Sequence, residues 1–135
     1  MRPLRPVIGI VGSAGAYGRW LQQFFEQAMG LQVIGHDTAD TGSASPEQVI
    51  AGAQVVIFSV PIRHTAQIIG QWVAMADGRE AAQLWLDITS VKVAPVQALL
   101  ASRAAVAGLH PMCAPPKSPT LKGRPLVVCA VRTGS

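Results

Sequence analysis

Residues 7–20 read VIGIVGSAGAYGRW, an apolar run followed by a turn with glycine at positions 12, 15 and 18. The apolar run predicts a buried strand, and the small residues that follow predict a tight connection into a helix. The spacing G-x-x-G-x-x-G differs from the G-x-G-x-x-G of dinucleotide-binding turns. Counting back from Gly18 restores that register, with Ser13, Gly15 and Gly18 at the three positions and Gly12 as an additional glycine.

In this register Ser13 replaces the residue of the tight turn, Gly15 lets the backbone approach a pyrophosphate, and Gly18 lets the helix pack on the strand. The backbone amides at the helix start, at Ala16 and Tyr17, are then expected to face the phosphates. Small residues also connect strands to helices where no ligand binds. By itself, the turn therefore fits both a cofactor loop and a plain connection from strand to helix.

Strand-like and helix-like segments alternate along the chain. A buried helical stripe at 21, 24, 25 and 28 ends near Gly30, and residues 45–48, SPEQ, have the form of a capped helix start. Strands are expected at 7–11, 31–35, 54–60, 83–88, 105–109 and 126–131, with further helices at 65–75 and 94–103. This order predicts one α/β domain over residues 1–135, a Rossmann-type, doubly wound, mainly parallel sheet with helices on both faces.

In such sheets a ligand lies at the carboxyl ends of the strands. Asp37 follows the second strand about 20 residues beyond the glycines, where a carboxylate binds a ribose diol. Because neither Thr38 nor Ala39 is basic, NAD is favoured over NADP. A loop carboxylate that caps its own turn is the alternative reading of Asp37. Cofactor contacts are also expected from the residues that end the third strand, Ser59, Val60 and Pro61.

The composition is that of a folded protein, because 50% of the residues are hydrophobic and 13% are charged. The net charge of +4 is scattered along the chain and predicts neither nucleic-acid nor membrane binding. Cys113 and Cys129 match no metal-ligand spacing, so no metal is expected. Arg2, Arg5 and the following apolar run imitate a secretory signal, but the run is short and interrupted. A cytoplasmic protein with reduced thiols is expected.

Three further segments, FSVPI at 58–62, LDITSVK at 86–92 and GLHPMCAP at 108–115, resemble signatures of the prephenate dehydrogenase family. With the glycine turn, the resemblance runs from about residue 7 to residue 131. It implies hydride transfer from prephenate to NAD, coupled to loss of CO₂, giving 4-hydroxyphenylpyruvate in tyrosine biosynthesis. His110 matches the family's catalytic histidine, which acts as a base on the ring hydroxyl. Ser90 matches the serine that binds the same hydroxyl.

The resemblance leaves several assignments open. Lys92 is expected near the anionic substrate, although pairing with Asp87 is an equal alternative. Members of the family usually have glycine where this chain has Ala114. They also continue into a helical domain that forms the homodimer and supplies an arginine for the substrate, which has no counterpart before Ser135. We therefore expect this cofactor half to bind NAD weakly and to turn over prephenate poorly or not at all.

Alternative functions share parts of this pattern. Arogenate and 4-amino-4-deoxyprephenate carry the same ring hydroxyl as prephenate. A β-hydroxyacid dehydrogenase shares the glycine turn, and a stand-alone NAD-sensing or interaction module shares the whole domain. For His36, which neighbours Asp37, a surface position is favoured and contact with adenosine is the alternative. His64 is expected at the surface, and Trp20, Trp72 and Trp85 are expected to pack in the interior. Nothing marks Cys113 as a nucleophile.

Overall fold

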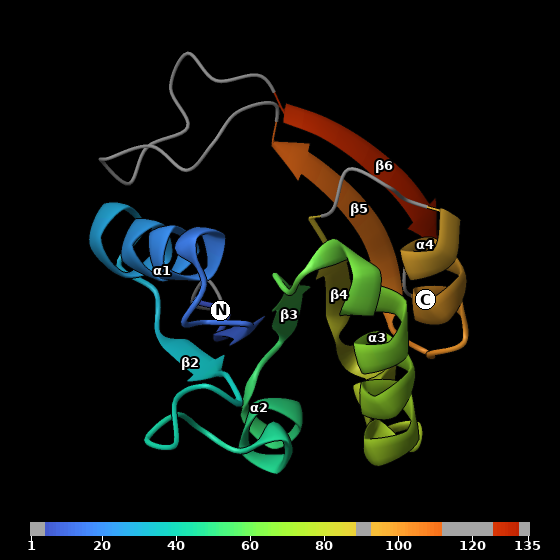
Figure 1. Cartoon of the computed structure of the whole chain (residues 1–135), viewed down its shortest axis with the longest axis horizontal. Coiled ribbons are helices and arrows are strands. Elements are labelled where there is room, and N and C mark those ends of the chain that lie inside the picture. Colours follow the sequence, from blue (N-terminus) through green and yellow to red (C-terminus); the bar gives the residue numbers. More distant parts are fainter. Residues whose placement is uncertain (1–4, 89–92, 112–125, 133–135) are drawn as a thin grey trace.

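The computed structural model describes residues 5–88, 93–111 and 126–132. A six-stranded sheet in the order β2-β1-β3-β4-β5-β6 forms its centre (Figure 1). Five strands are parallel, and the edge strand β6 runs antiparallel to β5. The strands are β1 (Ile8–Val11), β2 (Val33–His36), β3 (Val55–Phe58), β4 (Leu84–Asp87), β5 (Ala105–Pro111) and β6 (Leu126–Arg132). The predicted mainly parallel α/β sheet is confirmed.

The helices alternate with the parallel strands, as the sequence predicts. They are α1 (Ala16–Gln23), continued by the π-helical turn η1 (Phe24–Ala28), α2 (Pro46–Gly52), α3 (Ile62–Ala76), the 3₁₀ turn η2 (Arg79–Ala82) and α4 (Val93–Leu100). Among these helices, none is long and apolar enough to cross a membrane. Gly30, with φ +66°, ends the first helical segment as expected. Helix α3 begins three residues earlier than predicted, directly after Pro61.

The start of α2 carries the predicted capping box. The Ser45 hydroxyl accepts a hydrogen bond from the Gln48 amide over 3.2 Å, and the Gln48 side chain accepts one from the Ser45 amide over 2.8 Å. Pro46 occupies the first helical position, where its missing amide hydrogen removes no helical bond. The segment before the helix is tied to β2, because the Ala44 amide donates to the Gly35 carbonyl over 2.9 Å.

The two faces of the sheet are covered differently. Helix α1 packs on one face, and α2, α3 and α4 pack on the other (Figure 1). Right-handed crossovers require this division, because the chain moves from β1 to β2 in one direction and from β2 through β3 and β4 to β5 in the other. Trp20, Trp72 and Trp85 are buried, which confirms their predicted packing role. The sheet therefore presents the carboxyl ends of β1, β2 and β3 together between α1 and α3.

Candidate functional site

The tight turn after β1 is made by Gly12, which has φ +97°. A Cβ at this position would overlap the carbonyl oxygen of Ser59, because the ends of β1 and β3 lie side by side. The prediction that Ser13 takes the place of the tight-turn residue is therefore wrong. Ser13 is buried, its amide donates to the His36 carbonyl over 3.2 Å, and its side chain lies against Gly35.

Gly18 and Gly15 differ in what surrounds them. A Cβ on Gly18 would overlap the carbonyl oxygen of Gly12, so its predicted role in close packing of the helix on the strand is confirmed. A Cβ on Gly15 would come no nearer than 3.5 Å to any atom of the described chain, again the Gly12 oxygen. The backbone of Gly15 is also ordinary, with φ −75° and ψ 169°. Among the residues that the structure describes, no contact requires glycine at this position.

Asp37 joins the end of β2 to the glycine turn. Its Oδ2 accepts a hydrogen bond from the Ala14 amide over 2.9 Å, and its Oδ1 accepts one from the Ala39 amide over 2.8 Å. The second bond is the turn-capping arrangement that the sequence left open as an alternative. An ionised carboxylate has about four acceptor positions. Asp37 therefore keeps acceptor capacity for a ligand while it is fixed in place.

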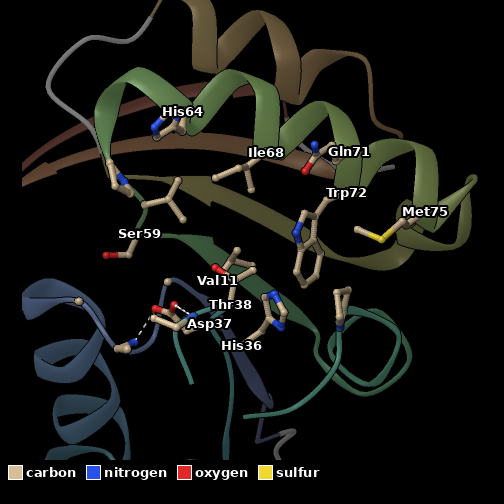
Figure 2. A pocket seen from close by; sticks show the side chains of 17 residues that line it. Val11, His36, Asp37, Thr38, Ser59, His64, Ile68, Gln71, Trp72 and Met75 are labelled. Atoms are coloured by element: carbon tan, nitrogen blue, oxygen red, sulfur yellow. Dashed lines mark hydrogen bonds between the residues drawn. The ribbon is translucent and has the colours of Figure 1, made fainter. Parts of the chain in front are cut away.

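A cavity of about 710 Å³ lies at this edge of the sheet, between the glycine turn and α3 (Figure 2). It has the volume of a small-molecule or cofactor site. Its lining residues come from the ends of β1, β2 and β3 and from the first turn of α2, together with one face of α3. They are Val11, Gly12, Ala14, Gly15, His36, Asp37, Thr38, Ala39, Pro46, Ser59, Val60, Pro61, His64, Ile68, Gln71, Trp72 and Met75.

The structure brings together most of the predicted cofactor residues. Gly12, Gly15, Asp37 and the segment 59–61 line the cavity. Ser13, Ala16, Tyr17 and Gly18 belong to the same turn and helix but do not line it. The remaining predicted residues of the chemical step are only partly described. The backbone of His110 lies in β5, whereas Ser90 and Lys92 lie outside the described residues, as does Cys113.

The backbone register places His110 at the same edge as the cavity. Gly108 of β5 pairs with Asp87, the last residue of β4, so His110 lies two positions beyond the end of β4. On the other side it pairs with Val127 of the antiparallel strand β6. Both β4 and β5 run parallel to the strands that end at the cavity.

Sequence reasoning missed the contribution of α3. Positions 64, 68, 71, 72 and 75 are spaced as one helix face, and all of them line the cavity. His64 is exposed, as expected, but it faces the site. His36 is half-buried rather than a surface residue: Nδ1 donates to the Ala44 carbonyl over 2.8 Å, and the ring lies edge-on to Trp72. The sequence did contain a signal for this face, because a helical pattern directly after a strand end places one side of the helix beside the ligand edge of the sheet.

An ion pair connects the two helices at the rim of the cavity. Arg79 bonds Glu47 in the first turn of α2 and also donates to the carbonyls of Met75 and Ala76 at the end of α3. The hydrogen bond from Arg79 lowers the pKa of Glu47, and the same bond raises the pKa of Arg79. Both side chains are exposed, so solvent screens their attraction. The pair ties the first turn of α2, which contains Pro46, to the end of α3, which contains Met75.

Comparison with known proteins gives a consistent assignment. Residues 26–129 match the family described as prephenate dehydrogenase, nucleotide-binding domain. The T-protein of Enterobacter agglomerans is 39% identical over 114 residues, which cover 83% of this chain and 28% of that protein. The chain thus spans less than a third of this relative's length.

Solved structures share the fold. One is a protein of Corynebacterium glutamicum described as a candidate prephenate dehydrogenase, with a TM-score of 0.67 at 20% identity, covering 93% of this chain and 45% of that one. Another is the pyrroline carboxylate reductase of Plasmodium falciparum, solved with NADP bound, with a TM-score of 0.67 at 14% identity, covering 93% of this chain and 48% of that one. The matched family and the 39% identical relative together show that this chain belongs to the prephenate dehydrogenase family, as its nucleotide-binding domain.

Proposed function

We propose that the cavity binds NAD and that this chain is the cofactor half of an enzyme that oxidises and decarboxylates prephenate to 4-hydroxyphenylpyruvate in tyrosine biosynthesis. The observation that carries the proposal is the open backbone at Gly15, one residue from the amide that holds Asp37. Because no described neighbour requires glycine at position 15, the missing side chain leaves room for a bound ligand. The pyrophosphate of a dinucleotide is the group that such turns accept at a helix start.

The first turn of α1 suits an anion. Gly15 is the N-terminal capping residue and offers no side chain to bond the first amides. The helix dipole adds partial positive charge at the same end. We assign the pyrophosphate to the side of the cavity formed by Gly12, Ala14 and Gly15.

Asp37 favours NAD over NADP. A ribose diol donates hydrogen bonds to a carboxylate, whereas a 2′-phosphate at the same position is repelled by it. The next two residues, Thr38 and Ala39, line the cavity and carry no positive charge. The bonds from Ala14 and Ala39 hold the carboxylate toward the cavity before any ligand arrives, so binding costs little reorganisation.

The chemical step is proposed for His110, Ser90 and Lys92. His110 would accept the proton of the ring hydroxyl and return it to the phenolate oxygen that loss of CO₂ leaves, and bound NAD would supply the hydride acceptor. Ser90 bonds the same hydroxyl, and Lys92 attracts the anionic substrate. The support is the position of His110 beyond the end of β4, at the edge where the cavity lies. We also propose that the whole enzyme is a homodimer, as the resemblance to the family implies.

Calorimetric titration with NADH tests the binding site. Gly15→Val places a branched side chain in the proposed pyrophosphate position and is expected to abolish binding while the thermal midpoint changes little. Gly42→Val is the matched control, because a Cβ at Gly42 is also no nearer than 3.5 Å to its neighbours and Gly42 does not line the cavity. Equal NADH affinity in wild type and Gly15→Val would contradict the proposal.

The reaction is tested separately in the enzyme that contains this domain. His110→Asn is expected to lower kcat with prephenate by roughly 10²–10⁴-fold, the usual contribution of a general base. NADH affinity is expected to stay unchanged, because His110 acts on the substrate. A normal kcat in this variant would contradict the proposed role of His110.

A further inference from the structure

The cavity has two chemically different ends, set by the length of α3. At the start of the helix, the segment 59–61 lies against Gly12 and the glycine turn. Met75 lies eleven residues further along the helix than His64, which is about 16 Å of helix axis. Toward that far end Ile68, Trp72 and Met75 make an apolar wall along α3 (Figure 2), and Pro46 of α2 also lines the cavity. Its size and character suit a flat heteroaromatic ring.

One side chain on this wall carries a carboxamide. Gln71 lies between Ile68 and Met75 on the cavity face of α3, and it is exposed to the cavity and solvent. Among the residues that the structure describes, no hydrogen bond is made by its side chain. By contrast, the nearby His36 already uses Nδ1 on the Ala44 carbonyl. Gln71 therefore brings both a donor and an acceptor to an otherwise apolar surface.

We propose that Gln71 is a specificity-determining residue that recognises the adenine base of the dinucleotide. The proposal rests on the proposed NAD site: with the pyrophosphate at Gly15 and the ribose at Asp37, the base extends toward the far end of α3. A glutamine carboxamide pairs with the 6-amino group and N7 of adenine, accepting from the first and donating to the second. The apolar wall contacts the faces of the ring, and Gln71 recognises the edge that carries the 6-amino group and N7.

Hypoxanthine provides a test, because it has a carbonyl where adenine has the amino group. Both atoms on that edge are then acceptors, and the carboxamide oxygen has no donor to face. Loss of one neutral hydrogen bond corresponds to a preference for NADH over its hypoxanthine analogue of about fivefold to tenfold. Gln71→Met keeps the length and helix propensity of the side chain but removes both polar groups.

The experiment is a calorimetric titration of wild type, Gln71→Met and Gln67→Met with NADH and with its hypoxanthine analogue. Gln67 is the matched control, because it is exposed on the same helix and does not line the cavity. Wild type and Gln67→Met are expected to prefer NADH, whereas Gln71→Met is expected to bind both dinucleotides equally.

The proposal is overturned if wild type binds the two dinucleotides equally or if Gln71→Met keeps the wild-type preference. Either result leaves the NAD site itself intact, because NADH still binds. Failure of wild type to bind any dinucleotide overturns the proposed function and the role of Gln71 with it. A circular dichroism melting curve for each variant verifies that the fold is retained.

Discussion

The carboxylate of Asp37 accepts a hydrogen bond from the backbone amide of Ala14 over 2.9 Å, which ties the end of β2 to the glycine turn. The register of the sheet makes this bond possible, because Val11, the last residue of β1, pairs with His36 immediately before Asp37. The proposed ribose and pyrophosphate positions are thus held in a fixed relation by the protein alone. Such preorganisation lowers the entropic cost of binding an extended ligand.

Asp37→Asn tests the charge at this position while keeping an oxygen that accepts from Ala14. We expect weaker NADH binding and a lower ratio of NADH affinity to NADPH affinity, because the repulsion of a 2′-phosphate is removed. The free energy of unfolding is expected to change by about 1 kcal/mol or less, the value of one part-exposed hydrogen bond. Parallel titrations with NADH and NADPH measure the ratio. An unchanged ratio would argue against contact between Asp37 and the ribose.

The three glycines of the turn are expected to respond differently to alanine. Gly12→Ala and Gly18→Ala should each lower the free energy of unfolding by roughly 2 kcal/mol or more. In both variants the new Cβ overlaps backbone atoms, and alanine at position 12 must also adopt a positive φ. Gly15→Ala should stay within about 0.5 kcal/mol of wild type. Urea denaturation of the three variants measures the difference. Equal stability of Gly18→Ala and Gly15→Ala would contradict the packing described for Gly18.

The buried side chain of Gln83 is expected to contribute strongly to the free energy of unfolding. Its buried amide donates to the carbonyls of Ile50 and Ala53 over 2.7 and 2.8 Å and accepts from the indole of Trp85 over 2.8 Å. Gln83→Met leaves these buried groups without their partner and should cost about 2–4 kcal/mol in chemical denaturation. Gln67→Met, the same change on an exposed part of α3, should be nearly neutral. Similar costs for the two variants would show that the Gln83 bonds contribute little.

The Glu47–Arg79 ion pair predicts a pH-dependent contribution to stability. The bond from Arg79 lowers the pKa of Glu47 below the ordinary value of 4.5. The contribution is therefore complete above that value and is lost as the pH falls through the lower pKa of the folded state. Wild type should be more stable than Glu47→Gln at neutral pH, and the difference should shrink as the pH falls below the ordinary pKa of Glu47. It should also shrink at high salt, because a screening length of roughly 3 Å at about 1 M weakens an exposed ion pair. A difference that is constant with pH would exclude the pair as its cause.

Much of the fold follows from local patterns. Alternating apolar strands and helical stripes predicted the order of elements, and the residues 45–48 predicted a capping box that the structure contains. These features depend on side-chain periodicity and on bonds between residues close in sequence. The π-helical turn at 24–28 was not predicted, because its apolar spacing is the same as that of an ordinary helix.

By itself, the sequence determined the parallel sheet, the edge at which its polar motifs end, and the presence of Asp37 and the glycine turn at that edge. Only the tertiary structure decided which glycine makes the turn and which face of α3 completes the cavity. A side chain at Gly12 is excluded because the carbonyl oxygen of Ser59, 47 residues away, lies against it once β3 pairs with β1. Likewise, Gln71 reaches the site because the crossover from β3 lays α3 beside the ends of β1 and β2. Both relations arise from strand pairing and crossover packing, which no local pattern encodes.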